Sequence, residues 1–208
     1  MSETELPQIY LITPSEIDLL DFPDRLAACL DSSPVACVRL ALGTRDEDRL
    51  SRAADALRAV THDRDVALVI DSHVQLVERL GLDGVHLTDA ARSVRAVRKE
   101  LGEDAIVGAH CGTSRHDGMN AGELGADYVS FGPVGATALG HATQAEAELF
   151  EWWSQMIEVP VVAEGALDPA LIRLLTPHTD FFGIGDEIWT QPDPARALRD
   201  LRGLMADL

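Results

Sequence analysis

Basic residues are scarce in this chain, which has 17 Lys and Arg against 35 Asp and Glu and a formal net charge of −18. Nucleic-acid binding needs clustered Lys and Arg against the phosphates, so this balance argues against a nucleic-acid partner. Aromatic residues make up only 5% of the chain. The hydrophobic core must therefore be built mainly from Ala, Val, Leu and Ile.

Long apolar runs are also missing, and we expect no secretory signal in the first residues. No stretch approaches the roughly 18 apolar residues that a membrane-spanning helix needs, so we expect no membrane association. The first residues lack the basic and apolar segments of a signal peptide. The three cysteines, Cys29, Cys37 and Cys111, lack the spacing of metal ligands. Such cysteine usage is typical of a reduced, cytoplasmic protein.

Short apolar runs alternate with helical patterns along the 208 residues. The runs are continuous rather than alternating, which predicts strands buried on both faces, as in a parallel sheet covered by helices. Helical patterns include residues 46–60, 93–101, 145–157 and 193–206, and Asp168-Pro169 has the form of a helix start. The eight predicted strands are residues 9–12, 35–40, 66–70, 84–87, 105–109, 128–131, 161–163 and 181–184.

Eight strand-then-helix units in a chain of this length predict a single (β/α)8 TIM barrel, with a doubly wound open sheet as the alternative. No linker, low-complexity tract or composition shift marks a boundary, so residues 1–208 are expected to form one domain. TIM barrels keep their chemistry at the carboxyl ends of the strands. Polar residues at those ends are therefore the candidate site.

Carboxylates stand at or beyond four of the predicted strands. Glu164, Asp186 and Glu187 near the seventh and eighth strands are suited to a cationic ligand or a metal, or else they face solvent. Asp71 and Asp89, near the third and fourth, are candidate ligands for a divalent cation. The alternative for Asp89 is a helix N-cap.

Two histidines and one arginine complete this set. His110, just past the fifth strand, is a candidate acid–base catalyst at neutral pH. His86 is a second candidate, or a strand histidine hydrogen-bonded inside the barrel. Arg39 anchors an anionic substrate group, or pairs with Glu164 or Asp71, or points outward toward the helices.

Four motifs extend through almost the whole chain: Tyr10-Leu11-Ile12-Thr13, Gly84-Val85-His86-Leu87, Gly125-Ala126-Asp127-Tyr128 with Gly132-Pro133-Val134, and Pro160-Val161-Val162-Ala163 with Gly165. In order and spacing the chain resembles the thiamine-phosphate synthase and thiazole tautomerase (TenI-like) superfamily of small TIM barrels. The resemblance implies a transferase of thiamine biosynthesis. Its reaction joins an aminopyrimidine pyrophosphate to a thiazole phosphate and uses Mg²⁺ to stabilise the leaving pyrophosphate.

The resemblance also suggests substrate-binding positions. Arg39 stands where the family has a Gln that helps to hold pyrophosphate, and His73 where it has an Arg. Thr137 lies in a loop that closes over the substrate in the family, or it belongs to a solvated Gly-rich loop. The family binds the thiazole phosphate through backbone N–H groups after the seventh and eighth strands. Here Glu164-Gly165 and Asp186-Glu187 take those places.

Three functions remain open. The chain is a divergent thiamine-phosphate synthase, a barrel enzyme that uses His110 or His86 on another substrate, or a non-catalytic binding or regulatory relative. A small-molecule ligand is the expected partner. Trp152 and Trp153 are adjacent on one predicted helix and face different sides, so one ring is a candidate for the interface of a homodimer.

Overall fold

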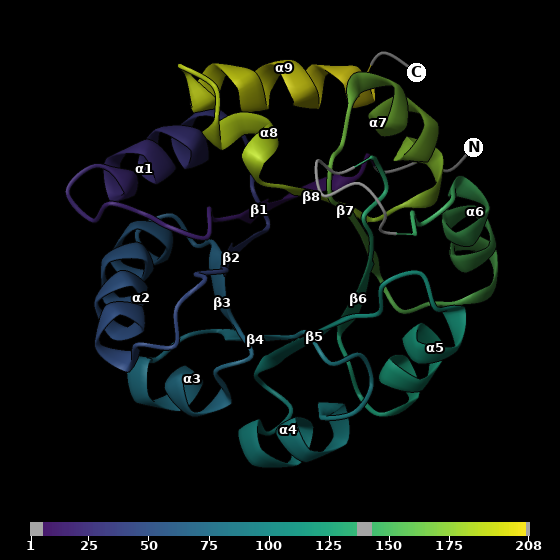
Figure 1. Cartoon of the computed structure of the whole chain (residues 1–208), viewed down its shortest axis with the longest axis horizontal. Helices are drawn as coiled ribbons and strands as arrows, with labels where there is room; N and C mark the ends of the chain where they lie inside the picture. The colour runs from purple at the N-terminus through teal and green to yellow at the C-terminus, as the bar shows by residue number, and fades with distance from the viewer. Residues whose placement is uncertain (1–5, 137–142, 207–208) are drawn as a thin grey trace.

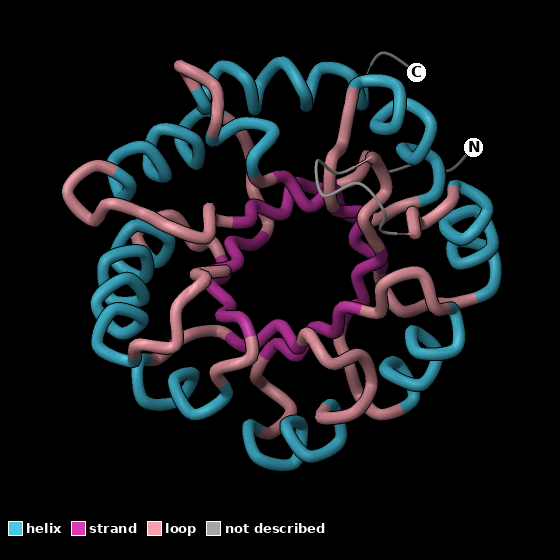
Figure 2. The backbone as a smooth tube through the Cα atoms, in the orientation of Figure 1, coloured by secondary structure: helices cyan, strands magenta, loops and turns pink. Residues whose placement is uncertain are grey.

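Eight parallel strands close into a barrel in chain order, with the first strand paired to the last (Figures 1 and 2). The computed structural model describes residues 6–136 and 143–206. Closure confirms the TIM barrel and excludes the open sheet. The strands are β1 (Gln8–Ile12), β2 (Cys37–Leu40), β3 (Ala67–Asp71), β4 (Gly84–Leu87), β5 (Ile106–His110), β6 (Tyr128–Phe131), β7 (Val161–Glu164) and β8 (Phe181–Ile184).

Helices form the outer ring around the strands (Figure 1). Their starts follow local signals: Asp46 caps the second helix by accepting the N–H groups of Asp48 and Arg49, and Asp168 caps the seventh ahead of Pro169. The helices are α1 (Phe22–Ser32), α2 (Glu47–His62), α3 (Val74–Leu80), α4 (Val94–Leu101), α5 (Arg115–Glu123), α6 (Ala147–Met156), α7 (Pro169–Leu175) with the 3₁₀ turn η1 (Thr176–His178), α8 (Asp186–Trp189) and α9 (Pro194–Ala206).

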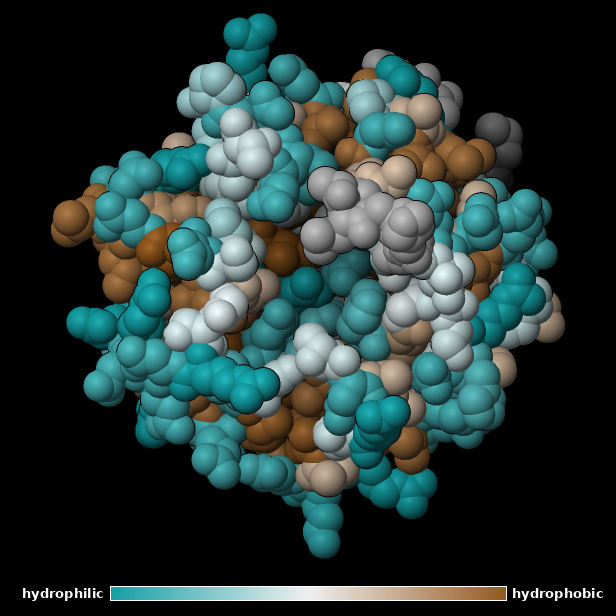
Figure 3. All heavy atoms as spheres, viewed as in Figure 1, coloured by the Kyte–Doolittle hydropathy of each residue, from teal (hydrophilic) through white to brown (hydrophobic). Residues whose placement is uncertain are grey.

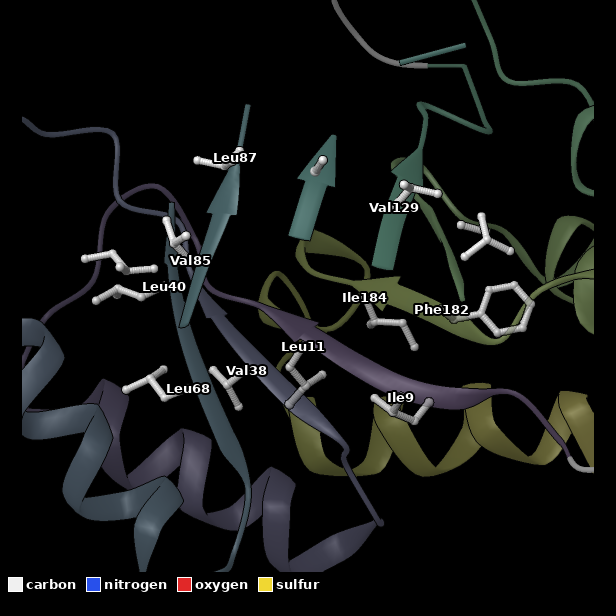
Figure 4. Packing of buried hydrophobic residues seen from close by; sticks show 14 of the residues in the cluster. Ile9, Leu11, Val38, Leu40, Leu68, Val85, Leu87, Val129, Phe182 and Ile184 are labelled. Atoms are coloured by element: carbon white, nitrogen blue, oxygen red, sulfur yellow. The ribbon is translucent and has the colours of Figure 1, made fainter. Parts of the chain in front are cut away.

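Alternation along each strand divides the core into two layers. Outward side chains pack under the helices, and Figure 4 shows ten labelled members of this layer, among them Ile9, Leu11 and Val38. Inward side chains fill the bore, where a smaller cluster includes Val69 and Val162. Both clusters are largely apolar, which is why most of each strand reads as a continuous hydrophobic run.

The two tyrosines of the chain meet inside the bore. The hydroxyl oxygens of Tyr10 and Tyr128 lie 2.6 Å apart, across from β1 to β6. Space for the second ring comes from Gly108 on β5, where any Cβ would collide with the ring of Tyr128. Gly108 therefore leaves the space that the Tyr128 ring occupies in the middle of the barrel.

Three predicted strands end one residue too early. Asp71, His110 and Glu164 are the last residues of β3, β5 and β7 rather than the first residues of loops. Each is still paired in register with a neighbouring strand, Asp71 with His86 and Glu164 with Gly183. The apolar pattern stops at these residues because they are polar, whereas the backbone ladder continues.

The adjacent tryptophans of α6 do separate, as their spacing predicts. Trp153 is buried and donates its indole N–H to the Val159 carbonyl oxygen, and Trp152 is half-buried beneath the guanidinium of Arg115. Whether Trp152 meets a second copy stays a prediction. In the part of the chain that the structure describes, no helix is both long and apolar enough to cross a membrane.

Candidate functional site

Five charged or ionisable side chains meet in the bore at the carboxyl ends of the strands. They come from five strands: Arg39 on β2, Asp71 on β3, His86 on β4, His110 on β5 and Glu164 on β7. Figure 3 looks down the same axis and shows hydrophilic side chains around a central hollow. These ionisable side chains gather at the end of the barrel where TIM-barrel enzymes keep their chemistry.

Arg39 lies at the centre of this polar group, pointing inward. Its Nη1 is 2.8 Å from Glu164 Oε2 and 2.9 Å from His86 Nε2. Its Nε lies 3.3 Å from Asp71 Oδ1, which forms an ion pair. The side chains of Arg39 and Glu164 are each only 11% exposed. Arg39 is thus paired with both of its predicted partners, Glu164 and Asp71. The alternative in which Arg39 points outward toward the helices is excluded.

The charges in this group hold one another in place. Burial alone would raise the pKa of Glu164, but the Arg39 charge and a hydrogen bond from His110 hold it well below its ordinary value. Burial raises the pKa of Asp71 to about 6 against the opposing effect of Arg39. At neutral pH Glu164 is therefore an anion and Arg39 its counter-ion.

His86 is a neutral link in a buried chain of hydrogen bonds. Since a guanidinium only donates, His86 Nε2 accepts from Arg39 and the proton sits on Nδ1. Nδ1 then donates to the Tyr128 hydroxyl at 2.9 Å, and Tyr128 contacts Tyr10. Burial, and then Arg39, lower the pKa of His86 far below its ordinary value. This is the geometry of a strand histidine hydrogen-bonded inside the barrel.

His110 has a different environment, half-buried at the mouth. Its Nδ1 lies 3.0 Å from Glu164 Oε1 and 2.9 Å from Ser130 Oγ. Because the ionised carboxylate only accepts, Nδ1 carries a hydrogen and Nε2 is the basic nitrogen. Nε2 has no hydrogen-bond partner among the described residues. The arrangement is that of a carboxylate-oriented histidine, which suits proton transfer.

Two groups of side chains near this centre offer atoms that can bind a metal. The ligand atoms of His86, His110 and Glu164 lie within 4.8 Å of one another, but the Arg39 guanidinium already bonds two of them, so the group does not fit a cation. Mg²⁺ prefers carboxylate oxygens. One oxygen of Asp71 and one of Asp89 are buried without a hydrogen-bond partner, and the Asp71 oxygen is the Oδ1 that forms the ion pair with Arg39 Nε. Whether Asp71 and Asp89 hold Mg²⁺ stays a prediction.

Beside the polar centre lies an open cavity of about 510 Å³, lined by the ends of β1, β7 and β8 and their loops. Gly165, Asp186 and Glu187, three of the predicted substrate-binding residues, line this cavity. Glu187 accepts the backbone N–H groups of Gly185 at 2.8 Å and Leu167 at 3.0 Å. The chain therefore supplies its own carboxylate to these two donors.

The structure does not gather all the predicted residues at one point. Glu164 pairs with Arg39, Glu187 binds backbone N–H groups and Asp186 is exposed, so these acids have separate environments. His73 lies in a different surface depression beside α3, with its Nδ1 2.6 Å from the Asp71 carbonyl oxygen. Asp89 accepts from Ser93, which stands at the N-cap position of α4, so Asp89 does not occupy that position itself.

One predicted residue, Thr137, lies outside the described residues. Three network members were missed from the sequence: Tyr10, Tyr128 and Ser130. Their signal is strand alternation, because Tyr128 and Ser130 are two apart and face the bore together. The alternation could not be recognised in the sequence because the neighbouring strand residues are also apolar. They do not indicate which face of the strand points into the bore.

Comparison with known proteins identifies the family. A family model described as thiamine monophosphate synthase matches residues 9–179. A thiamine-phosphate synthase of Rhodospirillum centenum is 40% identical over 201 residues, which cover 95% of this chain and 97% of that protein. The chain belongs to the thiamine monophosphate synthase family. A second relative from this family, the thiamine-phosphate synthase of Erythrobacter litoralis, is 38% identical over 94% of each protein.

Solved structures support the family's fold. Thiamine phosphate pyrophosphorylase from Pyrococcus furiosus aligns with a TM-score of 0.82 at 22% identity, covering 96% of both chains. A 3-hexulose-6-phosphate synthase aligns with a TM-score of 0.70 at 16% identity, covering 95% of this chain and 99% of that one. At these identities the likeness shows the shared barrel.

Proposed function

We propose that this member of the family joins an aminopyrimidine pyrophosphate to the nitrogen of a thiazole and releases pyrophosphate. The observation that carries the proposal is two buried carboxylate oxygens without hydrogen-bond partners, one on Asp89 and one on Asp71, the latter in an ion pair with Arg39 Nε. They lie by the ends of β3 and β4, in a barrel whose relatives are named thiamine-phosphate synthases. A small organic substrate also suits the adjacent cavity of about 510 Å³.

In this proposal some residues supply or bind positive charge, and others hold those residues in position. Asp71 and Asp89 hold Mg²⁺, which when bound neutralises charge on the pyrophosphate. Arg39, fixed by Glu164 and His86, contributes a permanent positive charge beside them. Because its carbon–oxygen bond breaks as the carbon–nitrogen bond forms, the pyrophosphate gains negative charge that these groups stabilise.

The proposal is tested by product formation and, independently, by Mg²⁺ binding. We expect product only with Mg²⁺, and a rise in stability of about 2.7 kcal/mol at 100 times the dissociation constant, seen as a higher unfolding temperature. Asp71→Asn and Asp89→Asn should lose this rise. Asp104→Asn is the matched control, since the exposed Asp104 precedes β5 at the opposite end of the barrel. An undiminished Mg²⁺ effect in both mouth variants contradicts the assignment.

A second candidate is supported by the contact between His110 and Glu164. A carboxylate-oriented histidine suits an enzyme that moves a proton on another substrate. His110→Gln separates the two functions. The condensation itself needs no proton at His110, so its rate should change by less than about tenfold, whereas loss of a general base costs about 10²–10⁴-fold. A large loss of condensation activity would instead place His110 in the chemistry.

A further inference from the structure

The hydroxyl group of Tyr128 lies behind the polar centre, deeper in the bore than Arg39. It accepts the Nδ1–H of His86 at 2.9 Å, and its oxygen lies 2.6 Å from that of Tyr10. The three side chains are nearly inaccessible, with His86 1%, Tyr128 7% and Tyr10 2% exposed. At this burial a lost hydrogen bond is not replaced by bulk water, so each polar atom depends on its neighbour in the chain.

Few hydrogen bonds fix the direction of the Arg39 guanidinium group. Both that it makes with the described residues come from Nη1, one to Glu164 and one to His86. Nε is buried without a hydrogen-bond partner, although it forms an ion pair with Asp71 at 3.3 Å. Nη2 has no partner among the described residues, so its two hydrogens remain for an anionic ligand. His86 therefore supplies half of the directional contacts of this group.

We propose that Tyr128 is a positioning residue: by fixing the His86 ring, its hydroxyl group holds the Arg39 guanidinium in the direction in which Nη2 meets the pyrophosphate group. The proposal rests on the proposed function, because pyrophosphate is the group that this function places beside Arg39. The hold of Tyr128 on His86 and Arg39 can be tested without any ligand.

Packing, and not His86, sets the position of the Tyr128 hydroxyl group. The Tyr128 ring fills the space beside Gly108, where a Cβ would lie 2.0 Å from the ring carbon that carries the hydroxyl. The Tyr10 ring contacts it edge-on, with the ring centroids 5.5 Å apart. A ring held in this way offers the Nδ1–H of His86 an acceptor at a fixed place.

Without that acceptor, His86 has only unfavourable arrangements. If its ring stays in place, the Nδ1–H is buried without a partner. If the ring turns to find another acceptor, Nε2 moves away from Arg39. The other tautomer does not help, because an Nε2–H would face a guanidinium group that only donates. Loss of the Tyr128 hydroxyl on β6 therefore loosens Arg39 on β2.

Tyr10→Phe is the matched control, because it removes the same hydroxyl group from the other ring of the pair. In the wild type, the three donors on His86, Tyr128 and Tyr10 make two hydrogen bonds, so one proton lacks an acceptor among the described residues. Tyr10→Phe also leaves one donor unpaired and keeps the contact between His86 and Tyr128. Tyr128→Phe leaves two, so it should unfold at a lower temperature than Tyr10→Phe.

The experiment measures two properties of the wild type and both variants. NMR gives the rotation rate of the Arg39 guanidinium group, and calorimetry gives the affinity for inorganic pyrophosphate with Mg²⁺. In Tyr128→Phe the rotation should be at least about threefold faster and pyrophosphate binding at least about fivefold weaker. Tyr10→Phe should stay within about twofold of the wild type in both. Both measurements report on the folded molecules, so a loss of stability alone leaves them unchanged.

The two measurements separate this proposal from the proposed function. Rotation in Tyr128→Phe as slow as in Tyr10→Phe, or an unchanged pyrophosphate affinity, overturns the proposal. If the wild type binds no pyrophosphate, the proposed function fails and with it the ligand named here, whereas the rotation rates still test the hold on Arg39.

A second form of the experiment applies if Tyr128→Phe does not fold. The chain has two tyrosines, so 3-fluorotyrosine incorporated into Tyr10→Phe replaces Tyr128 alone. Fluorine withdraws electron density from the hydroxyl oxygen and makes it a poorer acceptor for His86. Arg39 should again rotate faster and pyrophosphate should bind more weakly than in unlabelled Tyr10→Phe; equal values in both overturn the proposal.

Discussion

A single arginine organises the polar centre of this barrel. Arg39 bonds Glu164 and His86 and pairs with Asp71, so residues from three other strands depend on one guanidinium. Desolvating such groups is expensive, and the pairing compensates for it only while all partners are present. The same arginine occupies the space between His86 and Glu164, where it takes the place of a bound cation.

Replacing Arg39 with Met should therefore cost about 3–5 kcal/mol of unfolding free energy, because Glu164 is left as a buried, unpaired charge. The double variant Arg39→Met with Glu164→Gln should regain much of that loss, since no charge is then stranded. Urea unfolding of the wild type, both single variants and the double variant measures the coupling. A loss below about 1 kcal/mol in Arg39→Met would show that Glu164 finds another partner.

At the scale of elements, the contact between β5 and β6 depends on a glycine. A methyl group on Gly108 would collide with the Tyr128 ring, which is held by hydrogen bonds to His86 and Tyr10. Gly108→Ala should therefore destabilise the barrel by about 1–3 kcal/mol, the usual cost of overpacking. Gly203→Ala is the control: Gly203 lies in α9 with open space around it, so its replacement should stabilise by up to about 1 kcal/mol. Thermal unfolding of both variants should show opposite shifts.

The sequence predicted where the strands and helices lie more accurately than the residues at which they end. Apolar runs and helix caps such as Asp168 located the strands and helices. Periodicity could not show that Asp71 and His110 still belong to strands, because it follows hydrophobicity and not backbone pairing. Nor could it show that Glu187 would bind the Leu167 N–H, 20 residues earlier. That contact depends on how two loops fold against each other, which no local pattern encodes.

For the whole molecule, lowering the pH should change the unfolding free energy through groups whose contributions have opposite signs. His86 has a folded-state pKa far below its ordinary value, so its stabilising contribution is present above about pH 6.5 and is lost as the pH falls. Asp71 has a raised pKa of about 6, so its contribution becomes more favourable as the pH falls toward about 4. Glu164, with a lowered pKa, loses its contribution only as the pH falls below about 4.5.

These pKa shifts predict that the change in unfolding free energy between about pH 7.5 and 5.5 depends on His86. Below about 6.5 the unfolded chain binds a proton that the folded chain excludes, which lowers the unfolding free energy by up to about 1.4 kcal/mol per pH unit. His86→Gln can still accept from Arg39 and donate to Tyr128, yet it cannot titrate. Its unfolding free energy should therefore fall less than that of the wild type over this range, when both are measured by urea unfolding. The control is His62→Gln, at an exposed histidine of α2, which should keep the wild-type pH dependence of the unfolding free energy. If His86→Gln keeps this pH dependence too, protonation of His86 does not control the loss of stability in acid.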